Sequence, residues 1–193
     1  DFTSYTYNIS LYMINPVYYN AYMDGDHSVV KNFKLIARSG GSSKEIDAPR
    51  LEGFDLDFFI DDLEIVTIIN ATDTASSANS VDFRFKIIEP YGFTLTNKLA
   101  KAAVGLQALE TKDTKETIVG LNQLYFLMVR FYGYDKDGKI VTGKDYPQAD
   151  TKRTDEQCVF ERGWPIFIRE LNYRLDNKAV VYNATAKLVN LQT

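Results

Sequence analysis

Hydrophobic and polar residues alternate along several stretches of the chain, which is the pattern of half-buried β-strands. In residues 81–88 the odd-numbered positions are all apolar, and the even-numbered positions are charged as far as Lys86. Residues 5–13 alternate in the same way, and so do residues 179–189, which follow a predicted tight turn at 176–178. The pattern therefore predicts a strand in each of these three segments.

Three further segments predict strands with a less regular alternation. Residues 123–134 form a long strand that is apolar on both faces, and the sequence Asp-Lys-Asp-Gly at 135–138 predicts a hairpin turn after it. Residues 164–175 predict another strand. Residues 56–69 change the parity of their apolar positions at Asp-Asp 61–62, which predicts a bulge or a turn within that strand.

Two helices are expected beside these strands. Residues 95–109 carry leucine and alanine at helical spacing, and Thr94 is the expected N-cap residue. A short helix is expected over about 16–23, because the Asn-Pro pair at its start combines a capping side chain with a proline in the first turn. Residues 29–38 fit either a strand or a helix.

Strands outnumber helices and do not alternate with them, which argues against a doubly wound parallel sheet. The 13 tyrosines and 12 phenylalanines also favour β structure. We therefore expect a mainly β fold, an antiparallel β-barrel or sandwich with one packed α-helix, as a single domain over residues 1–193. Long polar loops are expected at 39–50, 71–79, 111–120 and 143–158.

Composition and charge exclude several classes of function. The net charge is −4 and no run of lysine or arginine occurs, so the sequence has no motif for nucleic acid and no basic patch for anionic lipid. No apolar stretch reaches the roughly 18 residues of a membrane helix. The single cysteine, Cys158, cannot form an internal disulfide or a cysteine metal cluster. We expect no metal and no cofactor.

Few residues are candidates for catalysis. Cys158 would be a nucleophile only with the single histidine, His27, as its base, and nothing around Cys158 presents a thiolate. Asp61, Asp62 and Glu64 would form a carboxylate cluster, although acidic residues beside a strand more often form a solvated face. The chain is therefore predicted not to be an enzyme, and a hydrolase that uses these three carboxylates is the alternative.

The segment Glu89-Pro90-Tyr91-Gly92 joins the clearest strand to the long helix. Such joints bind phosphate or present a nucleophile in many enzymes, but this one lacks the glycine-rich amides, the lysine and the nucleophile. It is interpreted as a structural joint. Pro90 ends the strand because it has no N–H, Gly92 can adopt a positive φ, and Thr94 then caps the helix.

Four segments together, 7–22, 83–99, 125–140 and 166–186, resemble virion structural proteins of contractile-tailed bacteriophages, of the baseplate, tail-hub or tail-tube type. Two features carry the resemblance. A strand ends in a Glu-Pro-aromatic-Gly turn and enters a helix, and a later strand contains Arg-Phe-Tyr-Gly-Tyr-Asp at 130–135.

The resemblance implies a tail-tube or hub-like β-barrel in a structural subunit at the baseplate hub or the end of the tail tube. Such a subunit would be located in the virion and assembled in the host cytoplasm. Its partners would be other copies of itself, in a trimeric or hexameric ring, and neighbouring tail or baseplate proteins. The apolar second face of the 123–134 strand would then be buried against a neighbour. The expected assembly contacts are Phe131, Tyr132, Tyr134 and Trp164.

A carbohydrate- or protein-binding β-sandwich, such as a receptor-binding or adhesion module, is the alternative function. Exposed tyrosines and Trp164 would then form the binding platform, since rigid aromatic side chains supply contact area at little cost in conformational entropy. Alanine at Trp164 or Tyr134, or binding to a glycan array, would separate the two functions.

Overall fold

The computed structural model of the protein describes most of its strands and both predicted helices. The described residues are 3–39, 58–68, 80–110, 123–141, 157–176 and 178–189. Two of the predicted loops, 71–79 and 111–120, and nearly all of the other two, 39–50 and 143–158, lie outside the described residues.

Seven strands form a closed β-barrel. Their order around it is β1 (Ser4–Met13), β2 (Lys34–Arg38), β3 (Phe59–Ile68), β4 (Ser80–Glu89), β8 (Ala179–Leu188), β7 (Phe160–Asp176) and β5 (Tyr125–Tyr134). Pairing of β5 with β1 closes the barrel, and among the described strands β6 (Ile140–Val141) pairs only with the end of β5. This confirms the expected mainly β fold. One pairing, of β2 with β3, is parallel rather than antiparallel.

The strands follow the alternation of the sequence where one face is covered. In β4 the side chains of Phe83 and Phe85 are buried, and Arg84 between them is exposed. In β3 the register with β4 shifts between Asp61 and Glu64, which confirms the predicted irregularity. Asp62 has a φ of 51°, the left-handed conformation that such a bulge can impose on its extra residue.

The helix α1 (Pro16–Met23) begins as predicted, because the Asn15 side-chain oxygen accepts a hydrogen bond of 2.7 Å from the Val17 N–H. The ambiguous segment 29–38 contains both kinds of structure. A 3-10 helix, η1 (His27–Asn32), precedes β2, and the chain becomes extended at the residue that links them.

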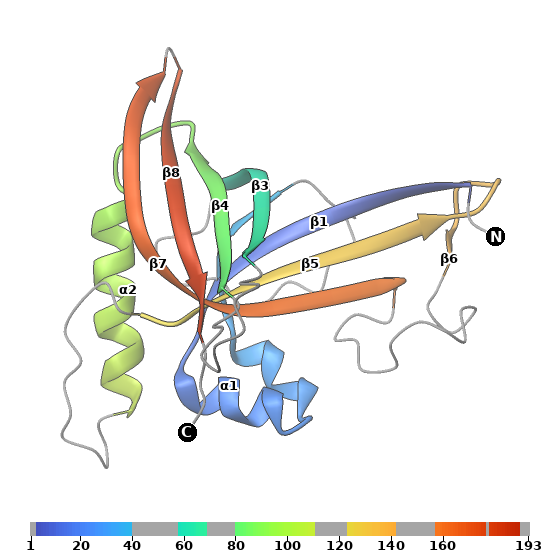
Figure 1. Ribbon diagram of the computed structural model, residues 1–193, viewed down its shortest axis with the longest axis horizontal. Coiled ribbons are helices and arrows are strands. Elements are labelled where there is room, and N and C mark those ends of the chain that lie inside the picture. Colours follow the sequence, from blue (N-terminus) through green and yellow to red (C-terminus); the bar gives the residue numbers. More distant parts are fainter. Residues whose placement is uncertain are drawn as a thin grey trace, which may run out of the picture.

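The helix α2 (Leu95–Glu110) lies alongside β7, on the outside of the barrel (Figure 1). Its apolar stripe is buried in the same hydrophobic cluster as Phe83 and Tyr182 of the barrel. Leu95, Leu99, Ala103 and Leu106 of the stripe are buried in this cluster, and Ala102 packs against it partly buried. The helix therefore adds a layer to the barrel core, as the sequence predicted.

The strand β7 belongs to two parts of the sheet. Its residues 160–166 pair with β5, and its residues 166–176 pair with β8. In Figure 1 β1, β5 and the first part of β7 extend to one side of the molecule, away from β4 and β8. We call this extension, made of β1, β5 and residues 160–166 of β7, the wing.

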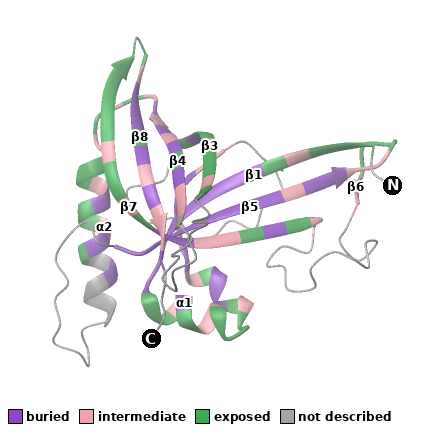
Figure 2. Ribbon diagram, viewed as in Figure 1, coloured by how far each residue is buried: buried purple, intermediate pink, exposed green. Residues whose placement is uncertain are grey.

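The strand β5 is buried on both faces within this one chain (Figure 2). Leu127 on one face belongs to the barrel core, and Phe126 and Met128 on the other face belong to a second hydrophobic cluster. Residues of α1 and η1, among them Tyr19, cover this second cluster. The expectation that a neighbouring subunit buries the second face of β5 is therefore wrong for these positions, because α1 and η1 bury it.

Candidate functional site

The two faces of the wing present different chemistry. Side chains of successive strand residues point to opposite faces, so Tyr7 and Ile9 of β1 share one face and Asn8 and Ser10 share the other. The register places Asn8 beside Arg130 and Arg130 beside Glu161, whereas Tyr7 lies beside Phe131. One face of the wing is therefore polar, and the opposite face is aromatic.

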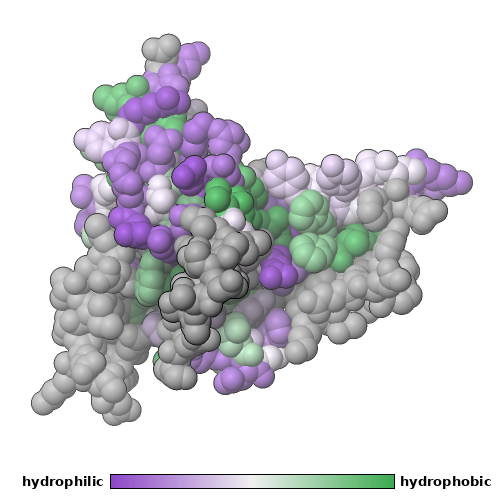
Figure 3. All heavy atoms as spheres, in the orientation of Figure 1, coloured by the Kyte–Doolittle hydropathy of each residue, from purple (hydrophilic) through white to green (hydrophobic). Residues whose placement is uncertain are grey.

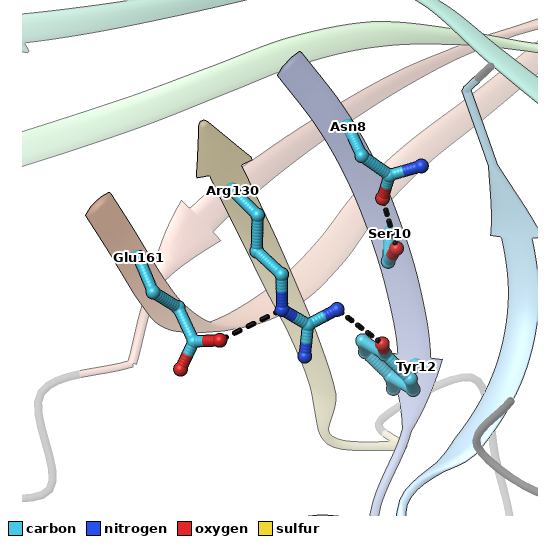
Figure 4. Close-up of polar contacts among 5 residues, drawn as sticks. All are labelled: Asn8, Ser10, Tyr12, Arg130 and Glu161. Atoms are coloured by element: carbon cyan, nitrogen blue, oxygen red, sulfur yellow. Dashed lines mark hydrogen bonds and ion pairs between the residues drawn. The ribbon is translucent and has the colours of Figure 1, made fainter. Parts of the chain in front are cut away.

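The polar face is buried and internally paired (Figure 4). The Arg130 Nε donates a hydrogen bond of 2.7 Å to the Glu161 Oε2, and the two side chains are only 5% and 3% exposed. The Arg130 Nη1 also donates to the Tyr12 hydroxyl, at 3.3 Å. Beside them, the Ser10 hydroxyl donates to the Asn8 Oδ1 at 2.7 Å.

Burial of this ion pair has an electrostatic cost that the pairing offsets. Burial alone would lower the pKa of Arg130, but the interactions with Tyr12 and Glu161 outweigh it and raise that pKa. Removing two charges from water costs several kcal/mol per ion, so such a pair persists only with good geometry and further hydrogen bonds. With all of these side chains buried and bonded to one another, the polar face serves the fold rather than an external ligand.

The aromatic face forms a groove with β3, of about 690 Å³. Figure 3 shows hydrophobic side chains gathered over the wing and in the angle where it meets the other strands. We call this site the aromatic groove. Its aromatic residues are Tyr5, Tyr7, Phe131, Phe160 and Trp164.

Three charged side chains lie among these aromatic rings. The Arg162 guanidinium lies 5.8 Å from the centre of the Trp164 ring, within the range of a cation–π interaction. Asp61 and Asp62 line the groove from β3, and Asp62 pairs with Lys86 of β4. Asp61 forms no ion pair with any described residue.

The predicted assembly contacts separate into three environments. Phe131 and Trp164 line the aromatic groove and are partly exposed. Tyr134 is partly exposed at the end of β5 and does not line the groove. Tyr132 is fully buried, because it lies on the same face of β5 as Arg130. The prediction that Tyr132 contacts a neighbouring subunit is therefore wrong.

The joint between β4 and α2 is organised by the buried carboxylate of Glu89. Its two oxygens accept hydrogen bonds from the Thr94 N–H at 3.0 Å, the Thr94 hydroxyl at 2.7 Å, the Leu95 N–H at 3.2 Å and the Tyr182 hydroxyl at 2.8 Å. Thr94 does begin the helix, since its carbonyl accepts from the Lys98 N–H. Its hydroxyl, however, donates to Glu89, so that Glu89 supplies the acceptors for these two N–H groups.

Gly92 has a different role from the one expected. Among the described glycines only Gly25 and Gly138 have a positive φ. A Cβ atom on Gly92 would lie 2.5 Å from the Glu89 Oε1, closer than real Cβ atoms approach any heavy atom. The joint therefore needs glycine for the space beside the Glu89 carboxylate, not for backbone freedom.

The charge of Glu89 is favoured by its partners. Burial by itself would raise the pKa of Glu89, but the hydrogen bonds from Thr94, Tyr182 and Leu95 outweigh burial and lower it. The positive end of the α2 dipole adds to this preference for a carboxylate at the helix N-terminus. The pKa of Tyr182 is raised in turn, by burial and by its hydrogen bond to Glu89. These groups hold the helix on the barrel.

The candidate catalytic residues lie on different elements of the described structure. Cys158 is fully buried just before β7, and His27 begins η1 with its ring centre 4.5 Å from that of Tyr22. Glu64 pairs with Arg84 at 3.4 Å, and both side chains are mostly exposed, which is the solvated acidic face expected for β3. No cluster of histidine, cysteine, aspartate or glutamate suited to a metal ion occurs among the described residues.

Comparison of this chain with protein-family models, with curated proteins and with solved structures finds no match. In the part of the chain that the structure describes, no helix is both long enough and apolar enough to span a bilayer. Proposals about function therefore depend on the chain's own residues and geometry.

Proposed function

We propose that the protein is a structural subunit of a contractile bacteriophage tail, at the baseplate hub or the end of the tail tube. It acts by joining copies of itself into a ring. The resemblance of four sequence segments supports the type of particle. The observation that carries the assembly is a pair of open strand edges, one on β1 and one on β7.

The first open edge is the outer half of β1. Only residues 10–13 of β1 pair with β2, whereas residues 4–13 pair with β5. The Ile9 N–H donates to the Ser39 hydroxyl and the Ile9 carbonyl accepts from the Ser39 N–H, so the odd-numbered backbone groups of β1 point away from β5. The backbone groups of Tyr5 and Tyr7 therefore point outward, where no described strand pairs with them.

The second open edge is the outer half of β7. Beyond Ile166, β7 pairs with β8 on one side and with no described strand on the other. Exposed apolar side chains lie along it, including Tyr173 and Leu175, which is 76% exposed. Unpaired N–H and C=O groups along an edge are a template for another strand. Two different edges on one chain produce a head-to-tail contact, which generates a ring when its rotation closes.

Light scattering after size-exclusion chromatography tests this proposal on the whole chain. We expect a particle mass of three or six chains. Tyr5→Pro removes one outward N–H from the β1 edge and leaves the pairing with β5 in place, so it should shift the protein to the monomer. Tyr5→Ala is the matched control, because it removes the same ring and keeps the N–H.

Three results would count against ring assembly through the β1 edge. One is a wild-type protein that stays monomeric at every concentration. Another is a Tyr5→Pro variant that assembles like the wild type. The third is equal dissociation of Tyr5→Ala and Tyr5→Pro, which would assign the contact to the ring of Tyr5 rather than to the strand edge. Unchanged circular dichroism of both variants is the control for folding.

A further inference from the structure

We propose that the aromatic groove binds a neutral oligosaccharide. The groove has the volume of a small-molecule site, and like such sites it combines apolar walls with a few convergent polar groups. The inference does not depend on ring assembly, because every described residue that it uses comes from one chain. The sequence analysis named a binding module as the alternative function, and the aromatic groove supplies a defined site and a defined ligand class for it.

The floor of the groove carries a row of aromatic rings that are tilted relative to one another. Tyr7, Phe131 and Phe160 lie directly opposite one another on three adjacent strands. Their ring centres are 6.1 Å apart for Tyr7 and Phe131, and 6.0 Å apart for Phe131 and Phe160. Tyr7 is nevertheless 52% exposed. A pyranose ring has an apolar face of C–H groups, which matches the exposed ring of Tyr7 or of Phe160.

The polar groups of the groove match hydroxyl groups. A sugar hydroxyl both donates and accepts hydrogen bonds, a carboxylate only accepts, and a guanidinium only donates. Asp61 on β3 and Arg162 on β7 supply one group of each kind. Because the Trp164 ring holds the Arg162 guanidinium, less side-chain entropy is lost when Arg162 binds a ligand.

The charges favour an uncharged ligand. Asp62 is neutralised by Lys86, and the remaining charges of Asp61 and Arg162 are opposite in sign. An anionic glycan would meet the Asp61 carboxylate, and a basic peptide would meet the Arg162 guanidinium. The groove therefore has no excess charge with which to attract either class.

The backbone of β5 and β7 in the groove offers no edge to a peptide strand. Extended peptides are commonly bound by strand addition, which needs an open edge. The floor of the groove is the side-chain face of β5 and of residues 160–166 of β7, and these strands are paired with each other. A ligand on this part of the floor is therefore recognised through side chains alone, whereas a peptide strand would pair with the open edge of β1 beside Tyr5 and Tyr7.

Trp164 is the only tryptophan of the chain, so its fluorescence reports on the groove directly. We would titrate the whole protein with maltohexaose, cellohexaose and the hexamer of N-acetylglucosamine, after a glycan array of neutral and anionic glycans. We expect neutral glycans to bind and to shift the Trp164 emission. Binding of anionic glycans alone, a response only to hexalysine, or no response to any glycan would overturn the proposal.

Two variants and a matched control locate the binding. Tyr7→Ala removes one ring of the row and keeps the backbone, and Asp61→Asn removes the charge of the acceptor. We expect each to weaken binding by about tenfold, the factor that corresponds to the loss of one aromatic or charged contact. Tyr91→Ala removes an exposed ring at the joint, away from the groove, and should bind like the wild type.

Denaturant unfolding and light scattering on the same variants separate this site from folding and from assembly. Tyr7→Ala should unfold and assemble like the wild type while it loses affinity. Equal affinity of Tyr7→Ala, Asp61→Asn and the wild type would overturn the assignment of the groove. If the wild-type protein proves to be a monomer, the glycan titration can still succeed. The two proposals are therefore tested independently.

Discussion

The two faces of the wing are formed by the same three strands, but they differ in polarity and in burial. On one face Arg130, Glu161 and Tyr12 are polar, bonded to one another and buried. On the other face Tyr7 and Phe160 are aromatic and exposed. The usual relation between polarity and burial is therefore reversed on this part of the molecule.

The reversal shows which face is committed to the fold. The buried polar groups already use one another as hydrogen-bond partners, so little of their bonding capacity remains for a ligand. The exposed aromatic groups have no such partner, and large exposed apolar surfaces on soluble proteins commonly mark interaction sites. We therefore assign stability to the polar face and propose recognition for the aromatic face.

The largest effect should come from breaking the buried ion pair. Glu161→Leu leaves the Arg130 charge buried without its carboxylate, which should lower the free energy of unfolding by about 3–5 kcal/mol. Glu64→Leu removes an exposed ion pair with Arg84 and should change the free energy of unfolding by about 0–1 kcal/mol. Urea unfolding measures both. A loss below about 1 kcal/mol for Glu161→Leu would mean that the polar face does not stabilise the fold.

Neighbouring residues of β7 offer a sharper test of the same contrast. A Cβ atom on Gly163 would lie 2.3 Å from the ring of the buried Phe126, so Gly163→Ala should cost about 1–3 kcal/mol of stability. Arg162→Ala on the groove face should cost less than about 1 kcal/mol and weaken ligand binding instead. Thermal unfolding of the two variants compares them directly. Equal losses would remove the distinction between the faces.

The joint between β4 and α2 contains another buried carboxylate, Glu89, whose contribution to stability can be tested. Gly92→Val would push the Glu89 carboxylate away from Thr94 and Leu95, at a cost of about 1–3 kcal/mol. If the clash is with Glu89, the same substitution should cost less in a Glu89→Ala background. A double-mutant cycle measures this difference. A cost that is the same in both backgrounds would place the strain elsewhere in the joint.

The same carboxylate should give the fold a dependence on pH. The pKa of Glu89 in the folded protein lies below its ordinary value of 4.5. Its ionised form therefore stabilises the protein fully above pH 4.5, and this contribution is lost as the pH falls through the lowered pKa.

Glu89→Gln should therefore cost about 1–3 kcal/mol at pH 7 and less at acidic pH. Urea unfolding of the wild type and the variant at several pH values measures the difference. A difference that does not shrink on acidification would show that the charge of Glu89 is not what stabilises the joint.

Local sequence pattern predicted the elements whose surroundings follow the usual rules. The residues of β4 alternate regularly between apolar and polar. The Asn15-Pro16 pair predicts the start of α1, because Asn15 caps the helix and Pro16 suits its first turn. Local pattern could not predict the closure of the barrel, because the pairing of β1 with β5 joins residues more than a hundred positions apart.

The candidate site was only partly predictable. Alternation alone makes Asn8 and Ser10 look like the exposed face of β1, yet both are buried. The available signal was Arg130, a charged residue within an apolar strand, whose burial requires a partner such as Glu161. Glu89 accepts hydrogen bonds from N–H groups five and six residues further along the chain. No sequence rule for a glycine turn predicts that contact.

Hydrogen–deuterium exchange at high and low protein concentration tests ring assembly through strand edges most directly. The account predicts that the amides of Tyr5 and Tyr7, and those amides of residues 167–176 that point away from β8, exchange more slowly at the concentration at which the protein assembles. Amides of β4 should serve as the unchanged reference, because β4 is paired on both sides within one chain. Equal exchange of the β1 and β7 edges in the assembled and the dissociated protein would contradict the account.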